Sequence, residues 1–196
     1  MILSILIATT YSRNNTLQKL IENINNQISI YNLSSKIELI VVFDEKQVSV
    51  GYKRQKLLEC ASGKYVCYID SDDNISDTYC KDIVDAIEQN PNSECVGFLI
   101  ECNMDGKIEL AIASNRYSDW CENKNGFRYC RTIYHKTPVR RDIALMVGFE
   151  DLRFAEDYKY AVGLKKTGLL KNEIFIDKVL YYYNYKYENP KTKYGL

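Results

Sequence analysis

The sequence predicts an α/β fold: a single domain in which a central mixed, mostly parallel sheet is flanked by helices. Apolar runs alternate with helical periods through residues 1–90, in the order strand, helix, strand, helix, strand. This order favours parallel strands joined by right-handed crossovers. A hairpin signal, Asn103-Met104-Asp105-Gly106, then separates two further apolar runs, so the sheet is expected to become mixed. The 196 residues suffice for one domain with a sizeable core.

Three apolar runs in the first half of the chain predict buried strands. They cover residues 2–8, 37–43 and 65–69. Two helices, 15–28 and 53–61, are expected between them because their apolar residues recur at intervals of three and four. The strands are followed by Thr9, Asp44 and Asp70, and the carboxyl ends of parallel strands share one edge of a sheet. Ligands of open α/β sheets bind at that edge.

The second half is expected to add helices, a hairpin and two closing strands. Ser76 is a candidate N-cap for a helix over 77–89, which Pro91 ends. The other expected helices are 143–147 and 157–166, and the expected strands are 95–102, 107–113, 171–176 and 179–185. Residues 114–136 show no period, which is typical of a functional or disordered loop. The polar tail, 188–196, is expected to be loose.

Composition argues against several classes of protein. Equal numbers of basic and acidic residues, 26 of each, give no net charge, so nucleic-acid binding through a basic field is not expected. Seven cysteines without a C-x-x-C pair and one histidine disfavour a zinc site and indicate a reducing, cytoplasmic compartment. The apolar start at 1–8 lacks the basic leader of a signal peptide. No run reaches the ~18 apolar residues of a membrane span.

Three carboxylates, Asp70, Asp72 and Asp73, follow the third expected strand. Carboxylates this close repel one another unless a cation or a raised pKa relieves them. Their oxygens suit Mn²⁺ or Mg²⁺, which one or two carboxylates hold while other positions stay open for a diphosphate. The alternative is a solvated acidic turn, in which Asp73 or Asp77 helps to begin the next helix.

Two other uses of such a motif fit the sequence poorly. A calcium loop counted from Asp70 requires Gly at its sixth position and Glu at its twelfth, where the chain has Ile75 and Lys81. A phosphatase of the haloacid-dehalogenase type has Thr or Val at the fifth position of a run near the N-terminus. Here the fifth residue is Asn74 and the run follows the third strand. A metal–diphosphate site is therefore the preferred interpretation.

A set of motifs, in the same order along the chain, resembles the family-2 glycosyltransferases of the GT-A fold. The matching segments are SILIATTY at 4–11, residues 37–44, Gly-Tyr-Lys-Arg-Gln at 51–55, Ala-Ser-Gly-Lys-Tyr at 61–65, Ile-Asp-Ser-Asp-Asp at 69–73, Gly-Phe at 148–149 and Glu-Asp at 156–157. The resemblance extends from residue 2 to about residue 167. The chain departs from the family pattern at Gln55, where Asn is usual, and at Ala155, where Gly is usual.

The resemblance implies a role for each matched residue. Asp157 would be the general base, and Asp72 and Asp70 the metal ligands. The residues expected to bind the nucleotide donor are Thr9, Tyr11, Asp44, Arg54, Asp70 and Ser71. Each role has a structural alternative, notably N-capping of a helix by Asp157 or Glu156 and, for Arg54, pairing with a surface acid. His135 is either an ordinary histidine or a further metal ligand or diphosphate donor.

The resemblance also implies a reaction. A sugar would pass, with inversion, from a nucleotide-diphosphate donor to an acceptor hydroxyl, with UDP as the expected nucleotide and Mn²⁺ or Mg²⁺ as the cofactor. The acceptor would be a carbohydrate, a lipid-linked group or a protein. Residues 1–90 would form the donor half and 91–187 the acceptor half. The alternatives are a non-catalytic nucleotide-sugar-binding module and a nucleotidyltransferase, which would release pyrophosphate.

Overall fold

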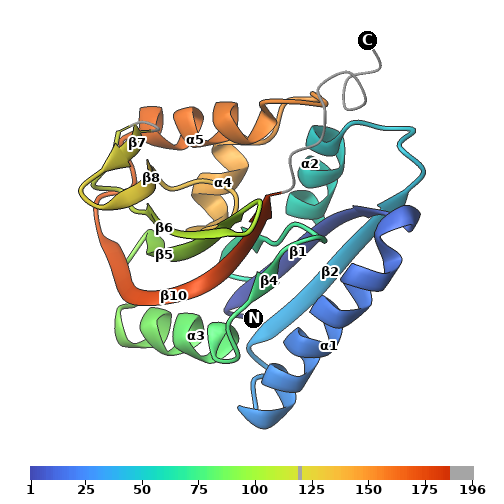
Figure 1. The fold of residues 1–196 in the computed structure, drawn as a ribbon. Helices are drawn as coiled ribbons and strands as arrows, with labels where there is room; N and C mark the ends of the chain where they lie inside the picture. Colours follow the sequence, from blue (N-terminus) through green and yellow to red (C-terminus); the bar gives the residue numbers. More distant parts are fainter. Residues whose placement is uncertain (119–120, 186–196) are drawn as a thin grey trace.

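A mixed sheet of ten strands forms the centre of the protein in a computed structural model that describes residues 1–118 and 121–185 (Figure 1). The strand order is β2–β1–β3–β9–β5–β6–β8–β7, and β10 joins the sheet by pairing with β4 and β5. The tail at 188–196, which the sequence predicts to be loose, lies outside the described residues. The longest ladders, β5–β10 and β1–β2, are both parallel, which confirms the predicted fold class.

The first three strands are parallel neighbours, as the sequence predicts. They are β1 (Leu3–Thr10), β2 (Ile37–Asp44) and β3 (Tyr65–Tyr68), joined through α1 (Asn14–Ile30) and α2 (Val50–Cys60). β1 runs two residues further than expected and leads into a 3₁₀ turn, Tyr11–Arg13. In the register of β1 and β2, Thr10 lies beside Asp44, so the polar ends of these strands meet at one edge.

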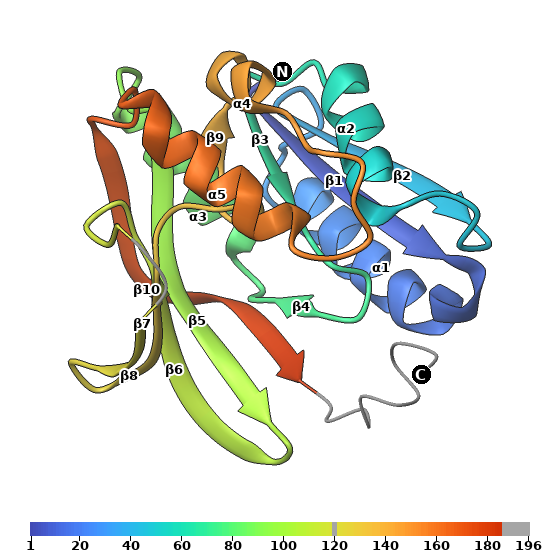
Figure 2. The same ribbon diagram turned by 90° about the horizontal axis from the view of Figure 1, so that it is seen from above.

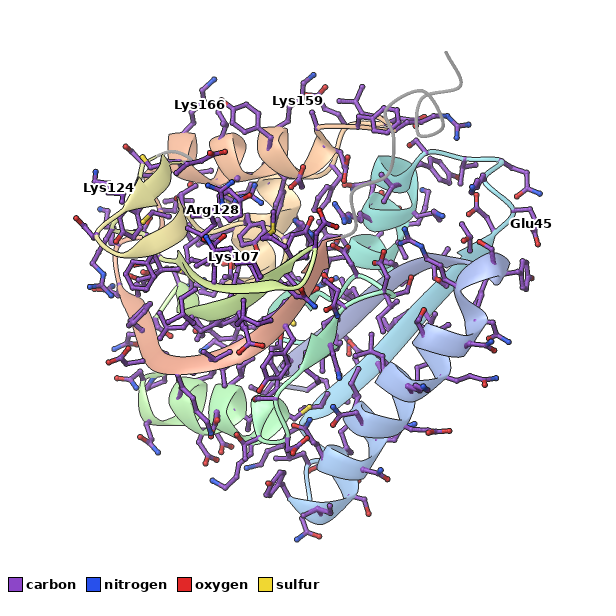
Figure 3. The ribbon with its side chains drawn as sticks, in the orientation of Figure 1. Glu45, Lys107, Lys124, Arg128, Lys159 and Lys166 are labelled. Carbon is purple, nitrogen blue, oxygen red and sulfur yellow. The ribbon has the colours of Figure 1, made fainter. Side chains whose placement is uncertain are left out.

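Helices cover both faces of the sheet, and alternate residues of each strand face opposite sides. In β1, Leu3 and Ile5 pack into a core with α1 and α3 (Tyr79–Gln89), whereas Leu6 packs into a second core with α2, α4 (Arg141–Val147) and α5 (Glu156–Thr167). Figure 2 shows α2, α4 and α5 together on the second face. Lys159 and Lys166 on α5 point away from the body of the molecule (Figure 3).

The start of α3 differs from the prediction. Residues Asn74–Ile75 form a short strand, β4, which pairs with β10 and carries the chain across to the other half of the molecule. The helix therefore begins at Tyr79, and Thr78 occupies its N-cap position. Ser76 is not the cap: its carbonyl accepts a hydrogen bond from the Tyr79 backbone N–H, and its hydroxyl is buried.

The predicted hairpin is confirmed as β5 (Cys95–Met104) and β6 (Lys107–Ala113). The two expected closing strands are one long strand, β10 (Glu173–Tyr185), whose register shifts near Val179 where the sequence pattern breaks. A short strand that the sequence does not signal, β9 (Val139–Arg140), pairs with β3 and with β5, linking the two halves of the sheet.

The stretch expected to be irregular, 114–136, contains a second hairpin. Its strands are β7 (Cys121–Lys124) and β8 (Phe127–Arg131). Asn125 and Gly126 make the turn with φ of 54° and 81°, a conformation that an Asn-Gly pair adopts readily. This dipeptide is the sequence signal that identifies the hairpin. β8 brings its last residue, Arg131, to the site described below.

Candidate active site

A cavity of about 790 Å³ lies between the carboxyl ends of β1 and β3, the start of α5 and the strands β5, β6, β8 and β10. Four of the residues that the sequence predicts for the site line it: Arg54, Asp70, Asp72 and Asp157. Further charged or polar residues line it as well, among them Arg13, Arg131, His135, Lys136 and Glu156. The fold thus brings together residues from both halves of the sequence.

Asp70 lies between two cations. Its Oδ1 atom is 2.8 Å from an Arg54 guanidinium nitrogen, and its Oδ2 atom is 3.0 Å from the Lys136 ammonium. Burial raises the pKa of Asp70, but Lys136 and Arg54 outweigh that effect and hold the pKa well below its ordinary value. Asp70 is therefore ionised at neutral pH, and both of its oxygens already face positive charge.

Arg54 is a buried side chain of α2 that joins two parts of the site. Besides Asp70 it pairs with Glu156 at the start of α5, and its guanidinium lies 5.9 Å and 6.0 Å from the ring centres of Tyr68 and Phe149. The alternative in which Arg54 pairs only with a surface acid is therefore wrong. The adjacent Gln55, where the family usually has Asn, accepts a hydrogen bond of 2.8 Å from the backbone N–H of Phe149.

Asp72 and Asp73 have opposite surroundings. Asp72 lies on the cavity wall with 44% of its side chain exposed, 3.0 Å from Arg13. Asp73 is buried, and its carboxylate accepts hydrogen bonds from Lys136 at 2.5 Å and from the Tyr181 hydroxyl at 2.7 Å. Burial raises the pKa of Asp73, an effect that Lys136 opposes. The interpretation of the acids as a solvated turn is wrong for Asp70 and Asp73.

Asp157 lies in the first turn of α5. The N-cap position of that helix belongs to Ala155, in the left-handed conformation with φ 61°, so neither Asp157 nor Glu156 is the cap. Asp157 Oδ2 is 3.4 Å from Arg131, and 29% of the side chain is exposed. Burial raises the pKa of Asp157, but His135, Arg131 and Arg54 more than offset this and lower it. The carboxylate is ionised and reachable from the cavity.

His135 lies between the two acids and is only 3% exposed. Its Nε2 atom is 3.6 Å from Asp70 Oδ2, and its Nδ1 atom is 3.9 Å from Asp157 Oδ2. Both separations exceed hydrogen-bonding distance, and within the described part of the chain neither ring nitrogen has a hydrogen-bond partner. Burial and the charge of Arg54 lower the pKa of His135 to about 4, so the imidazole is neutral at neutral pH.

The other predicted donor residues lie beside the cavity rather than on its wall. Asp44 pairs at 2.5 Å with Lys53, whose ammonium also donates a hydrogen bond of 3.1 Å to the carbonyl of Thr9. Tyr11 stacks on Phe43 with ring centres 5.5 Å apart, and both rings are exposed. Ser71 is buried. Asp44, Thr9 and Tyr11 thus form a second group, at the ends of β1 and β2.

Sequence reasoning did not assign Lys136, Arg131 or Lys53 to the site. Lys136 and Arg131 come from the stretch without periodicity, and only the folded chain brings Lys136 to Asp73, 63 positions away. The sequence did hold one signal for these cations. Three acids in four positions need positive charge nearby, and Arg131 and Lys136 lie close in sequence to the one histidine of the chain, itself a candidate site residue.

A family model for "Glycosyl transferase family 2" matches residues 45–152, more than half of the chain. The chain belongs to glycosyl transferase family 2. This confirms the family that the motifs resemble and the expected enzyme class, glycosyltransferase. A search of curated proteins found no match.

Solved glycosyltransferases share the fold. The TarS protein of S. aureus has a TM-score of 0.65 at 16% identity, over 94% of this chain and 37% of that one. Its 1–349 fragment in complex with UDP-GlcNAc has a TM-score of 0.63 at 18% identity, over 98% of this chain and 61% of that one. The catalytic domain of Drosophila beta1,4galactosyltransferase 7 in complex with xylobiose has a TM-score of 0.56 at 13% identity, over 92% of this chain and 68% of that one. The present chain therefore covers 37% to 61% of the length of these TarS chains.

Two properties relevant to cofactors and membranes hold for the described residues. Residues 1–118 and 121–185 contain no group of three or more His, Cys, Asp or Glu side chains arranged to hold a metal ion. No helix in the same ranges is long and apolar enough to cross a membrane. The metal ligands Asp70 and Asp72 therefore remain predictions.

Proposed function

We propose that this family 2 chain transfers a sugar, with inversion, from a UDP-sugar to an acceptor hydroxyl. One observation carries the proposal. Asp157, the expected general base, and Asp70, the expected donor-side acid, lie within 4 Å of the same imidazole ring, His135, in one cavity. A donor and an acceptor bound in that cavity would meet between them.

UDP is the proposed nucleotide. The TarS fragment that shares the fold was solved in complexes with UDP and with UDP-GlcNAc. In this chain Tyr11 and Phe43 offer an exposed aromatic pair and Asp44 a carboxylate at the adjacent strand end, which suits a base that stacks and donates an N–H. The cations Arg13 and Arg54 line the cavity at positions suited to the diphosphate.

A divalent metal fits the site through Asp72. The Asp72 carboxylate is exposed on the cavity wall and offers hard oxygen ligands. Mg²⁺ and Mn²⁺ are commonly held by one or two carboxylates together with substrate phosphates. Asp70 would ligate the same ion by sharing one of its oxygens with Arg54 or with Lys136. The metal would supply positive charge for the leaving diphosphate.

The residues of the chain account for the remaining steps. Asp157, ionised and partly exposed, accepts the proton of the attacking hydroxyl. The hydroxyl oxygen bonds to the anomeric carbon from the face opposite the diphosphate, whose bond to that carbon breaks and whose oxygen leaves with the electron pair. Arg54 fixes Asp70 and the start of α5 relative to each other and so holds the two reactants in line.

The acceptor side is proposed to be the part of the cavity formed by the second half of the chain. Tyr129, Tyr134 and Tyr183 line it, and aromatic rings of this kind suit a carbohydrate face. Carbohydrate, lipid-linked and protein acceptors all carry the required hydroxyl. The division into a donor half, 1–90, and an acceptor half, 91–187, is part of the same proposal. All seven cysteines carry free thiols, which supports a cytoplasmic setting.

Product analysis tests the proposed function. The chain is incubated with a panel of UDP-sugars, with Mn²⁺, Mg²⁺ or a chelator, and UDP, free sugar and pyrophosphate are measured. Release of UDP that is slowed in the Asp157→Asn variant supports the proposal. Release of pyrophosphate instead identifies a nucleotidyltransferase. Binding of UDP-sugars with no turnover under any condition identifies a binding module.

A further inference from the structure

The loop after β2 determines the shape of the proposed nucleotide site. It consists of residues 45–49, between Asp44 and the start of α2. The backbone N–H of Val48 donates a hydrogen bond of 3.1 Å to Asp44 Oδ2, so the loop folds back onto the carboxylate that ends the strand. Lys46 has the left-handed conformation, with φ 64°. A residue with a side chain keeps this sparsely populated conformation only where its surroundings enforce it, and such residues cluster at functional sites.

The segment that leads into α5 is packed against the first turn of α2. The backbone N–H of Gly51 donates a hydrogen bond of 3.1 Å to the carbonyl of Leu152. The Ser49 hydroxyl donates one of 2.5 Å to Asp151. A Cβ atom at Gly51 would lie 2.0 Å from the carbonyl oxygen of Glu150, so the two backbones approach as closely as glycine allows. The position of this segment relative to the loop after β2 is therefore fixed.

Arg153 connects the fixed segment to the loop. Its two terminal nitrogens donate hydrogen bonds to the carbonyls of Lys46 and Gln47, at 3.2 Å and 3.4 Å. The donor is charged, and hydrogen bonds from a charged donor are stronger than neutral ones. One of them ends on Lys46, the residue whose backbone conformation is sparsely populated. The loop thus receives a contact from outside at the residue where its own backbone is least favourable.

We propose that Arg153 is a positioning residue of the donor site, which holds residues 45–49 in the shape that presents Asp44 to the nucleotide base. The inference rests on the proposed function and adds to it a contribution to donor binding from the second half of the sequence. The general base is held separately, because Glu156 beside it pairs with Arg54. Loss of Arg153 should therefore weaken the binding of the nucleotide and leave the catalytic step unchanged.

Amide hydrogen exchange, followed by NMR, tests this role without any ligand. The proteins are wild type, Arg153→Met and a matched control, Lys159→Met, which removes an exposed ion pair with Glu150. The N–H of Val48 should exchange roughly fivefold faster in Arg153→Met and at the wild-type rate in Lys159→Met. The N–H of Gly51, bonded to the backbone of Leu152, should not change and serves as the internal reference. Equal exchange at Val48 in all three proteins overturns the proposal.

Binding and kinetics test the consequence for the donor. Arg153→Met should weaken the binding of UDP, measured by calorimetry, by roughly fivefold to tenfold, and should raise the KM for hydrolysis of the UDP-sugar by the same factor. Arg153→Lys can still donate to one of the two carbonyls and should lose less. The kcat of hydrolysis should stay close to that of wild type in both variants. A fall in kcat at unchanged KM overturns the proposal.

A second substitution distinguishes support of the loop from direct contact with the nucleotide. Asn adopts the left-handed conformation more readily than most residues with a side chain, so Lys46→Asn should stabilise the loop in the absence of Arg153. Added to Arg153→Met, it should restore most of the UDP affinity. Lys46→Gln removes the same charge without favouring that conformation, and it should restore none. Equal UDP affinity of the two double variants overturns the positioning role.

Other outcomes separate this inference from the proposed function. Equal UDP affinity of wild type and Arg153→Met overturns the role of Arg153 and leaves the proposed function intact. Faster exchange at Val48 without any loss of UDP affinity shows that Arg153 supports only the loop, and this also overturns its role in donor binding. A wild-type chain that binds no UDP refutes the proposed nucleotide, and the role of Arg153 in the donor site with it.

Discussion

The ammonium of Lys136 lies 3.0 Å from Asp70 and 2.5 Å from Asp73, and so joins two carboxylates of the acidic turn through one buried cation. Its charge also faces the rings of Tyr181 and Tyr183 at 4.5 Å and 4.4 Å. The two acids raise the pKa of Lys136, so it is charged at neutral pH. The acidic turn therefore has its own counter-ion before any ligand binds.

Removing that cation should destabilise the protein. Lys136→Met leaves the carboxylates of Asp70 and Asp73 buried without it, and breaking a buried ion pair in this way costs about 3–5 kcal/mol. Urea unfolding measures the loss. Lys81→Met, which removes an exposed ion pair with Asp85 on α3, is the matched control and should change the free energy of unfolding by less than about 1 kcal/mol. Similar losses in both variants would contradict this account.

Asp72 should matter for donor binding and little for stability. Its side chain is 44% exposed and pairs with Arg13, which is exposed as well. Asp72→Asn is expected to abolish the effect of Mn²⁺ on UDP affinity, measured by calorimetry, while the melting temperature stays within about 2 °C of wild type. Asp85→Asn on α3 serves as the control. If a chelator leaves the UDP affinity of the wild type unchanged, the metal role of Asp72 is excluded.

Asp157 should be required for turnover. Asp157→Asn retains the shape of the side chain but cannot take up a proton, so UDP release is expected to fall by ~10² to 10⁴. Because Ala155 and not Asp157 occupies the N-cap position of α5, the thermal stability should change little. Wild-type turnover in this variant would remove Asp157 as the base, and Glu156 would be the next residue to test.

Asp44 should determine the affinity for the nucleotide. Asp44→Asn removes the charge that pairs with Lys53 and changes the hydrogen-bond acceptor offered at the end of β2. We expect weaker binding of UDP by calorimetry, by roughly tenfold for one charge-assisted hydrogen bond. Lys53→Met separates the two effects, because it removes the ion pair but retains the carboxylate. Unchanged UDP affinity in Asp44→Asn would mean that the uracil base binds elsewhere in the protein.

Glu38 should make stability depend on pH. Burial raises its pKa, but hydrogen bonds from Ser4, Ser62 and Gly63 outweigh this and lower it from 4.5. A lowered pKa means that Glu38 stabilises the fold above the pKa of the unfolded chain and that the effect disappears as the pH falls through the folded pKa. Glu38→Gln should therefore be less stable than wild type by about 1.5 kcal/mol at neutral pH.

The same pair of proteins supplies the control. Urea unfolding at acidic pH should show a smaller stability difference between wild type and Glu38→Gln than at neutral pH, because the wild-type carboxyl becomes protonated as the pH falls through its lowered pKa. A difference that stays constant between the two pH values would mean that the hydrogen bonds, and not the charge, account for the effect of Glu38.

The sequence predicted the first half of the fold well because local pattern and tertiary structure agree there. The strands that end near Thr9 and Asp70 are mostly buried on both faces, whereas the edge strand that ends at Asp44 is mostly half-buried; all three are short apolar runs in the sequence. The second half was harder. β4 and β9 have only two residues each, and they form because β4 pairs with β10 and β9 pairs with β3. Such pairing between distant segments leaves no pattern in the local sequence.

The site shows the same division. The motifs placed Asp70, Asp72, Arg54 and Asp157, and the fold brings all four to one cavity. Their partners could not be predicted, because the contacts of Asp70 with Lys136 and of Asp157 with Arg131 depend on how β8 and the chain after it cross the end of the sheet. Whether Asp157 caps its helix was also open until the backbone of Ala155 was known.

The contact between β10 and the acidic turn has a consequence for synthesis of the protein. The Tyr181 hydroxyl donates to Asp73, 108 positions earlier in the chain, and accepts from the backbone N–H of Asp70. On the ribosome the three parallel strands β1, β2 and β3 emerge first and can pair. Their acidic turn acquires its contacts with β10 only after Tyr181 has left the exit tunnel. A nascent chain stalled before that residue should therefore bind UDP poorly, although every residue proposed to bind the donor has been translated, and the nucleotide is expected to bind only to the finished protein.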